Sequence, residues 1–180
     1  TVLDDAVQSR HVWIVRSGIL RVQRHGVEGR RQILSLVLPG ESVGYDLHRR
    51  EGLGVEASTR SELCAIDRRL FVRCMDTSSD LRRRIYVQQA AQLDRLRWLT
   101  WAIGVLTPQE RLCAFLALGT RFMPYQPMPD GSGVLTVQMP RVDVADLLGT
   151  TVESISRITH RLQDDGVLQI RDPEHFQIMD

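Results

Sequence analysis

The chain has 180 residues, enough for one or two small domains that each bury a hydrophobic core. Its 23 basic and 22 acidic residues give a formal net charge of +1, so any nucleic-acid binding must depend on basic groups that are concentrated locally. No apolar run is long enough to cross a membrane and no signal peptide opens the chain, which predicts a cytoplasmic protein with no membrane partner. The three cysteines lack metal-finger or paired spacing, as suits a reducing compartment.

The stretch 1–66 has the pattern of antiparallel β-structure. Apolar residues alternate through Val12–Val22 around a Ser-Gly turn, and a further strand is expected at Gln32–Leu38 after a glycine-containing hairpin. Short strands broken by glycines predict a small barrel or roll. Because Thr1 opens inside this alternation, we expect that further residues precede it in the native protein and that the roll is truncated here.

A short helix is expected at Leu70–Met75 and a long one at Leu81–Leu106. The apolar residues of the long helix face too many directions for a surface helix that is covered on one side. The simplest cover is the same helix of a second subunit, which predicts a homodimer, and packing against the chain's own β domain is the alternative. The residues expected at the dimer contact are Leu93, Leu96, Leu99, Ile103 and Leu106, with Trp98 and Trp101 beside them.

A third helix is expected at Gln109–Phe122, because Thr107-Pro108 is a helix-start signal. The segment Pro124–Gly133 is rich in Pro and Gly and is expected to be a loop. Near the end of the chain, Val167–Ile170 and Phe176–Met179 alternate around a short turn, which predicts a β-hairpin.

Two helices joined by a tight turn are predicted between Pro140 and Asp165. Gly149 ends the first helix, and the hydroxyl of Thr150 or Thr151 caps the second. Followed by the β-hairpin, the pair predicts a winged arrangement. The residues expected on the inward faces are Val142, Val144, Ala145 and Leu148, then Val152, Ile155, Ile158, Thr159 and Leu162.

The second of these helices carries a polar face. Glu153, Ser156, Arg157 and His160 are spaced at i, i+3, i+4 and i+7 and point away from the apolar stripe. A helix that reads bases in the major groove needs such groups: an arginine for guanine, a carboxylate for the cytosine amino group and a hydroxyl beside a thymine methyl. An ordinary solvated face of a packed helix pair is the alternative.

Three segments in this order resemble the Crp/Fnr family of bacterial transcription regulators, in its Fnr/FixK-like branch. IVRSGILRV and LPGESVGYD resemble the effector-domain roll, the long apolar helix resembles the dimerisation helix, and TVESISR resembles the recognition helix. The resemblance implies an α+β fold in three parts. These are a cyclic-nucleotide-binding-like β-roll at 1–80, a dimerisation helix at 81–106 and a winged helix-turn-helix domain at 107–180.

The same resemblance implies that Glu153, Ser156 and Arg157 read a TTGAT-like half-site in double-stranded DNA, repeated as an inverted palindrome by the dimer. Contacts to the DNA backbone position a protein without reading sequence, and they are expected from Arg141, Thr150, Thr151, His160 and Arg161. Contacts with RNA polymerase are implied for the loop Pro124–Gly133 and the hairpin His25–Arg30. A solvent-exposed connection is the alternative for both.

Departures from the family pattern bear on the signal that is sensed. Cyclic-nucleotide-binding members hold the ribose and phosphate with a Gly-Glu pair and an Arg-Ser or Arg-Thr pair. Here Gly44 is followed by Tyr45, and Arg50–Gly54 contains no Arg followed by Ser or Thr. A buried phosphate without its guanidinium would be an uncompensated charge, so cyclic AMP is not the expected ligand.

Cys64 matches the position of one cysteine ligand in the oxygen-sensing Fnr proteins. A [4Fe-4S] cluster is held by four thiolates, so Cys64 could serve only if three further cysteines precede Thr1, and a small buried strand residue is the alternative. Cys74 and Cys113 are expected to be structural. Oxygen, redox state and nitric oxide stay open as signals, and so does control by protein abundance alone. A haem sensor also stays open, and its weak candidates for axial ligands are His11, His25 and His48.

A ligand-binding module that regulates a partner protein through the helix pair is an alternative function, and it predicts no salt-dependent affinity for DNA. An enzyme is not expected. The sequence contains no nucleophile elbow, phosphate-cradling glycine loop, paired metal ligands or carboxylate pair with a supporting base. Activation and repression of transcription both stay open.

Overall fold

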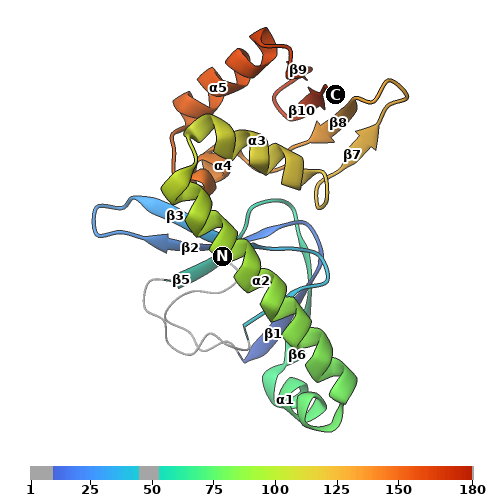
Figure 1. Ribbon diagram of the computed structural model, residues 1–180. Helices are drawn as coiled ribbons and strands as arrows, with labels where there is room; N and C mark the ends of the chain where they lie inside the picture. The colour runs from blue at the N-terminus through green and yellow to red at the C-terminus, as the bar shows by residue number, and fades with distance from the viewer. Residues whose placement is uncertain (1–9, 45–52, 180) are drawn as a thin grey trace. The chain divides into compact units, whose positions relative to one another are not determined.

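The computed structural model describes residues 10–44 and 53–179 (Figure 1). The expectations for Tyr45, His48 and residues 50–52 therefore lie outside the described residues. The chain divides into two compact units, Thr1–Leu99 and Thr100–Asp180, and the division falls inside one long helix.

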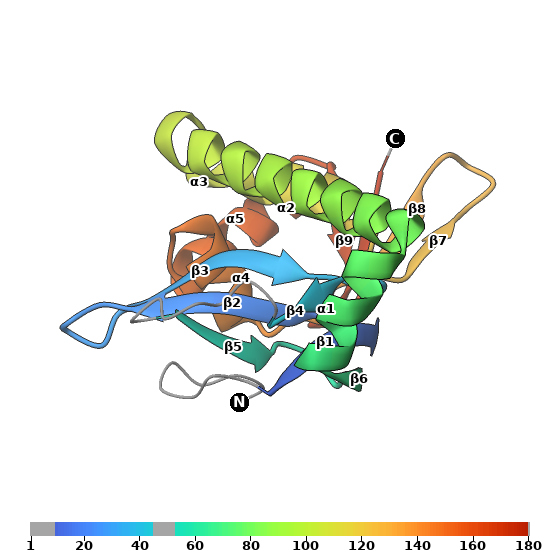
Figure 2. The same ribbon diagram turned by 90° about the horizontal axis from the view of Figure 1, so that it is seen from below.

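The first unit is built on two antiparallel three-stranded sheets, ordered β4-β1-β6 and β3-β2-β5. This arrangement confirms the predicted small roll. Helix α1 follows the strands directly and contacts β1 and β6 (Figure 2). The bounds are β1 (His11–Ser17), β2 (Leu20–His25), β3 (Arg31–Val37), β4 (Ser42–Val43), β5 (Leu53–Ala57), β6 (Glu62–Asp67) and α1 (Arg68–Thr77).

Two apolar clusters hold this unit together. The first joins the two sheets, and its buried members are Val15, Leu20, Val37, Val43 and Val55. The second fixes the helices to the sheet, and its buried members are Val12, Phe71 and Ile85. Removal of these side chains from water is the main favourable free-energy term in forming the unit.

Helix α2 (Ser79–Val105) is the long helix predicted from the apolar pattern, shifted by one or two residues at its ends. It ends at Val105, two residues before Thr107, which is the N-cap of the next helix. The Thr107 hydroxyl accepts a hydrogen bond from the Glu110 N–H, and the Glu110 carboxylate accepts one from the Thr107 N–H at 2.7 Å. This capping box satisfies amides that a helix start leaves without partners.

A polar latch joins α2 to the start of β4 and to the residue before it, and it consists of Glu41, Ser42, Gln88, Gln92 and Arg95. The Glu41 carboxylate accepts from Arg95 Nη2 at 2.6 Å and from Gln92 Nε2 at 3.3 Å. The Gln88 amide accepts from the Ser42 N–H at 3.1 Å and donates to the Ser42 carbonyl at 3.0 Å. These directional bonds fix which side of the N-terminal part of α2 faces the roll.

An ion pair on the β3-β2-β5 sheet makes the stability of the folded state depend on pH. Arg21 Nη2 lies 2.7 Å from Glu56 Oε2, and the hydrogen bond from this guanidinium lowers the pKa of Glu56. A depressed carboxyl pKa stabilises the folded state at pH values above the unfolded pKa, and this contribution is lost as the pH falls through the folded pKa. We expect Glu56→Gln to lower the free energy of unfolding by about 1 kcal/mol at pH 7.

Urea unfolding of both proteins between pH 2 and pH 7 tests this expectation. The difference between wild type and Glu56→Gln should shrink at acidic pH, because Glu56 is then protonated in both the folded and unfolded states. A difference that is constant across this range would mean that the pair does not contribute through charge.

The second unit has the winged helix-turn-helix arrangement that the sequence predicts. Helices α4 and α5 pack against α3, and a four-stranded antiparallel sheet has the order β7-β8-β10-β9 (Figure 1). The bounds are α3 (Pro108–Gly119), β7 (Tyr125–Pro127), β8 (Gly133–Thr136), α4 (Arg141–Leu148), α5 (Val152–Asp164), β9 (Leu168–Ile170) and β10 (His175–Ile178).

One prediction for this unit is wrong in part. The segment Pro124–Gly133 was expected to be a loop throughout, but Tyr125–Pro127 forms an edge strand that pairs with β8. Pro127 lacks an N–H and is tolerated there because an edge strand leaves one side without ladder bonds. In the described part of the chain, no helix combines the length and the apolar character needed to span a membrane.

Candidate nucleic-acid interface

The turn between α4 and α5 is defined by one glycine and one threonine. Gly149 caps α4 in the left-handed conformation, with φ 60° and ψ 47°, which non-glycine residues adopt only at a cost. Thr151 caps α5, because its hydroxyl accepts from the Ser154 N–H at 3.2 Å. Of the two threonines that the sequence offers as the cap, Thr151 therefore has this role.

The inward faces of α4 and α5 follow the predicted stripes with two exceptions. On α5, the buried side chains are Ile155, Ile158, Thr159 and Leu162. Val142 and Val152, predicted to face inward, are exposed. Each lies in the first turn of its helix. On α4, the fully buried side chain beside Val142 is instead that of Asp143.

The outward face of α5 carries the residues predicted to read bases. Glu153, Arg157 and His160 are exposed, and Ser156 is half-buried. Hydrogen bonds from its own backbone N–H and from the Thr151 hydroxyl lower the pKa of Glu153. Its carboxylate is therefore an ionised acceptor at neutral pH, on the same face as the Arg157 guanidinium.

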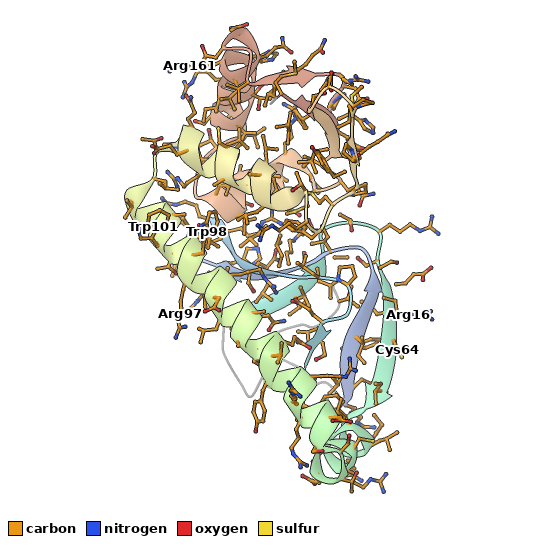
Figure 3. The ribbon with its side chains drawn as sticks, turned by 45° about the vertical axis from the view of Figure 1, so that its right-hand side comes forward. Arg16, Cys64, Arg97, Trp98, Trp101 and Arg161 are labelled. Carbon is orange, nitrogen blue, oxygen red and sulfur yellow. The ribbon has the colours of Figure 1, made fainter. Side chains whose placement is uncertain are left out.

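The residues predicted to contact the DNA backbone surround this face. Thr151, His160 and Arg161 are exposed, whereas Arg141 and Thr150 are half-buried. Arg161 projects outward from α5 (Figure 3) and lies 3.9 Å from the nearest carboxylate oxygen of Asp165. At this distance in solvent the pair is weak, so the guanidinium can still bind another anion.

A buried cation that the sequence analysis missed lies behind the turn. Arg111 of α3 is 9% exposed, and its Nη1 donates to the Leu148 carbonyl at 2.5 Å and to the Gly149 carbonyl at 3.4 Å. The sequence gives no signal for this position, because an arginine on an amphipathic helix is ordinarily expected at the surface.

The predicted dimer contact on α2 divides into two faces. Leu93, Leu96 and Ile103 are 45%, 40% and 39% exposed, whereas Leu99 is only 7% exposed. Leu99 is therefore assigned to the core of its own chain rather than to a dimer contact. Leu106 is half-buried. Figure 3 places Trp98 and Trp101 on the same helix, and Trp101 is exposed.

Cys64 lies on the edge strand β6, and its side chain is exposed (Figure 3). The expectation that it might be a buried strand residue is therefore wrong. Within residues 10–44 and 53–179, no group of three or more His, Cys, Asp or Glu side chains could hold a metal ion. The donors present there do not fit a [4Fe-4S] cluster, which needs four thiolates. Cys74 and Cys113 are half-buried on helices, and burial raises the pKa of the Cys113 thiol.

Each unit matches a known domain family. Residues 2–78 match the cyclic nucleotide-binding domain, and residues 110–180 match the Crp-like helix-turn-helix domain. These matches correspond to the sheets of the first unit and to the helix-turn-helix with its β-wing.

Similarity to known proteins extends across both units. The chain is 30% identical over 166 residues to the nitrogen fixation regulation protein FixK of Rhizobium meliloti, covering 92% of this chain and 72% of that protein. It is 28% identical over 168 residues to the transcriptional activator protein FnrL of Cereibacter sphaeroides, covering 92% and 68%. The structure of FixK2 from Bradyrhizobium japonicum has the same fold, with a TM-score of 0.82 and 23% identity over 95% of this chain and 83% of that one. The chain therefore belongs to the Crp/Fnr family of DNA-binding transcription regulators, which are not enzymes.

Proposed function

We propose that this regulator binds, as a homodimer, an inverted repeat of TTGAT-like half-sites and activates transcription in response to a signal other than cyclic AMP. The observation that carries the proposal is the two-sided character of α5. One side is buried against its own unit, and the other carries the exposed Glu153 and Arg157 and the half-buried Ser156.

Each of the three residues has a distinct role in base reading. Arg157 donates two hydrogen bonds to guanine O6 and N7, the pairing that best distinguishes guanine in the major groove. Glu153 accepts from an exocyclic amino group on the complementary strand, which its lowered pKa favours by keeping it ionised. Ser156 lies beside a thymine methyl.

Five further residues anchor the helix to phosphates without reading sequence. Arg161 and His160 lie one turn beyond the base-reading residues on α5, and both are exposed. The other three lie at or near the start of the helix pair and its turn, and they are Arg141, Thr150 and Thr151. The Thr151 hydroxyl already caps α5. We therefore expect the phosphate near Thr151 to be bound by backbone N–H groups at the N-terminus of α5.

The dimer contact is proposed along a single seam of α2. Tyr86, Gln89, Leu93, Leu96, Thr100 and Ile103 are spaced alternately by three and four residues. This heptad spacing is typical of two helices that pack side by side in a coiled coil. A dimer formed through two copies of α2 has two recognition helices, one for each half-site of the palindrome.

Activation is proposed from the relatives, because FnrL of Cereibacter sphaeroides is named a transcriptional activator protein. Contact with RNA polymerase is assigned to the hairpin His25–Arg30 and to the segment Pro124–Gly133. The first is the turn between β2 and β3, and most residues of the second are exposed around the turn between β7 and β8. Full activation in vitro by a variant that lacks residues 128–131 would contradict the second assignment.

Direct binding of a labelled TTGAT-N4-ATCAA duplex, compared with a scrambled duplex of the same composition, tests the proposal. Fluorescence anisotropy should give an affinity at least 10³-fold higher for the inverted repeat, the lower end for specific DNA-binding proteins. The affinity should also fall steeply between about 50 mM and 200 mM salt as counterions are released from the DNA.

The alternative function, a module that regulates a partner protein through the helix pair, predicts a different result. Neither duplex would then bind with a salt-dependent affinity. Equal, salt-dependent binding of both duplexes would retain DNA binding and contradict the TTGAT-like site.

A further inference from the structure

Arg111 occupies a place where a cation is costly unless it is satisfied. It is almost fully buried under the turn between α4 and α5, and an unpaired charge in such a place destabilises the folded state. Its guanidinium donates to the carbonyls of Leu148 and Gly149. The backbone of the turn therefore accepts from Nη1 of the guanidinium, while Nε of Arg111 is buried without a hydrogen-bond partner among the described residues.

The two carbonyls need a donor from outside their helix. The last carbonyls of a helix have no partner within it, and at this end the amides of Gly149 and Thr150 both donate to Ala145. Arg111 supplies a donor for the carbonyls of Leu148 and Gly149, the third and fourth residues after Ala145. A guanidinium suits this position because its several donors have a fixed geometry and because the C-terminal end of a helix favours positive charge.

Two side chains lie close to the turn at Gly149. A Cβ added at Gly149 would lie 3.3 Å from Arg111 Nη1 and 3.8 Å from Ile103 Cδ1. Arg111 of α3 and Ile103 in the last turn of α2 therefore both lie against this stretch of backbone. Only Thr150 and Thr151 separate it from the first residue of α5, so a displacement of the turn moves the start of the recognition helix.

We propose that Arg111 is a positioning residue for DNA recognition: it holds the α4–α5 turn so that α5 presents its polar face at the angle that base reading requires. The inference rests on the proposed reading of bases by α5. Arg111 itself is not expected to touch a base, because its side chain is buried.

This role has a signature that a purely stabilising role would lack. Contacts to base edges require correct placement within a fraction of a hydrogen-bond length, whereas electrostatic attraction to phosphates tolerates a tilt of the helix. Loss of Arg111 should therefore reduce the preference for the cognate sequence and leave binding to unrelated DNA nearly unchanged.

The test compares full-length wild type with Arg111→Met, which fills similar volume without a donor, and Arg111→Lys, which keeps one charged donor group. Arg121→Met is the matched control, because it removes an exposed arginine from the same unit. The cognate duplex is the sequence that wild type enriches from a random pool, and its scrambled form is the reference. Hydrogen exchange of residues 149–158 is measured without DNA.

We expect Arg111→Met to lower the ratio of cognate to scrambled affinity at least tenfold, with scrambled affinity within twofold of wild type and faster exchange in 149–158. Arg111→Lys should restore part of the ratio, and Arg121→Met should match wild type. An unchanged ratio for Arg111→Met would overturn the proposal. A parallel loss on both duplexes that follows a lower melting temperature would also overturn it, because Arg111 would then serve stability alone.

Failure of the proposed function would give a separate result. Wild type would then enrich no sequence from the pool, while hydrogen exchange would still report whether Arg111 orders the turn. If Arg111→Met does not fold, Arg111→Lys replaces it in the comparison. A wild-type ratio of cognate to scrambled affinity for Arg111→Lys, together with wild-type hydrogen exchange in residues 149–158, would contradict the need for a guanidinium at this position.

Discussion

Replacement of Leu93 with Asp will convert the protein to a monomer and lower its affinity for the inverted repeat at least 100-fold. Leu93 lies in the middle of the exposed seam, between Tyr86 and Ile103. Burial of a leucine contributes about 1.5–3 kcal/mol, and a symmetric contact contains two copies of it. The variant loses this contribution and must also desolvate two carboxylates. A monomer then loses the advantage of binding two linked half-sites, which amounts to a factor of about 10²–10⁴.

Light scattering after size exclusion gives the oligomeric state, and anisotropy gives the affinity. Val87→Asp is the matched control, because Val87 is an exposed apolar residue on another flank of α2, outside the heptad series. It should stay dimeric. Circular dichroism of Leu93→Asp shows whether the monomer is folded. A folded Leu93→Asp dimer with wild-type affinity would move the dimer contact away from this seam.

Replacement of Arg157 with Ala will weaken binding to the inverted repeat by about 1–3 kcal/mol and will remove discrimination at one base pair of each half-site. The structure leaves this guanidinium exposed, and within residues 10–44 and 53–179 its side-chain hydrogen bond is a long one, 3.5 Å, to the Ser154 hydroxyl. Little must be broken for it to bind guanine. Arg157→Lys should recover part of the affinity and less of the discrimination, because an ammonium cannot form the two-pronged contact.

Affinities for the four duplexes that differ at the guanine position measure this effect. Arg161→Ala is the companion variant, since it removes a neighbouring exposed arginine assigned to phosphate. It should weaken all four duplexes uniformly and reduce the salt slope by about one. If Arg157→Ala also weakened all four equally, the guanine would have to be read by another residue.

The parts of this fold that the sequence predicts are those that depend on local chemistry. Gly149 marks the end of α4 because only glycine adopts a left-handed backbone at little cost. Thr107 and Pro108 mark the start of α3 for similarly local reasons. The spacing of apolar residues along α5 predicted its buried side because neighbours three and four apart share one face of a helix.

The parts that could not be predicted depend on neighbours far away in the sequence. Val152 is exposed and Asp143 is buried, and the periodicity of apolar residues does not report which part of a helix its packing partners cover. Arg111 lies 37 residues from the carbonyl of Leu148 that it satisfies. No local pattern links a helix residue to a turn that only the folded unit brings beside it.

The position of a strand in its sheet also depends on residues that are distant in the sequence. Cys64 has the residue type of a core position, but it is exposed on β6, the last strand of its sheet. Strand order is set by pairing between distant segments, so a single strand's sequence does not say whether it lies in the middle or at the edge.

The polar latch on α2 has a consequence for how this helix can change in evolution. Gln88, Gln92 and Arg95 bond one side of the helix to Glu41 and Ser42. These bonds fix the direction around the helix axis in which each later residue of the helix points. Each added residue turns the rest of an α-helix by about 100°. A single insertion after Arg95 would leave the latch intact and swing Leu96 and Ile103 away from Leu93, whereas an insertion of seven would nearly restore their alignment. Length changes in this helix should therefore be tolerated only in whole heptads.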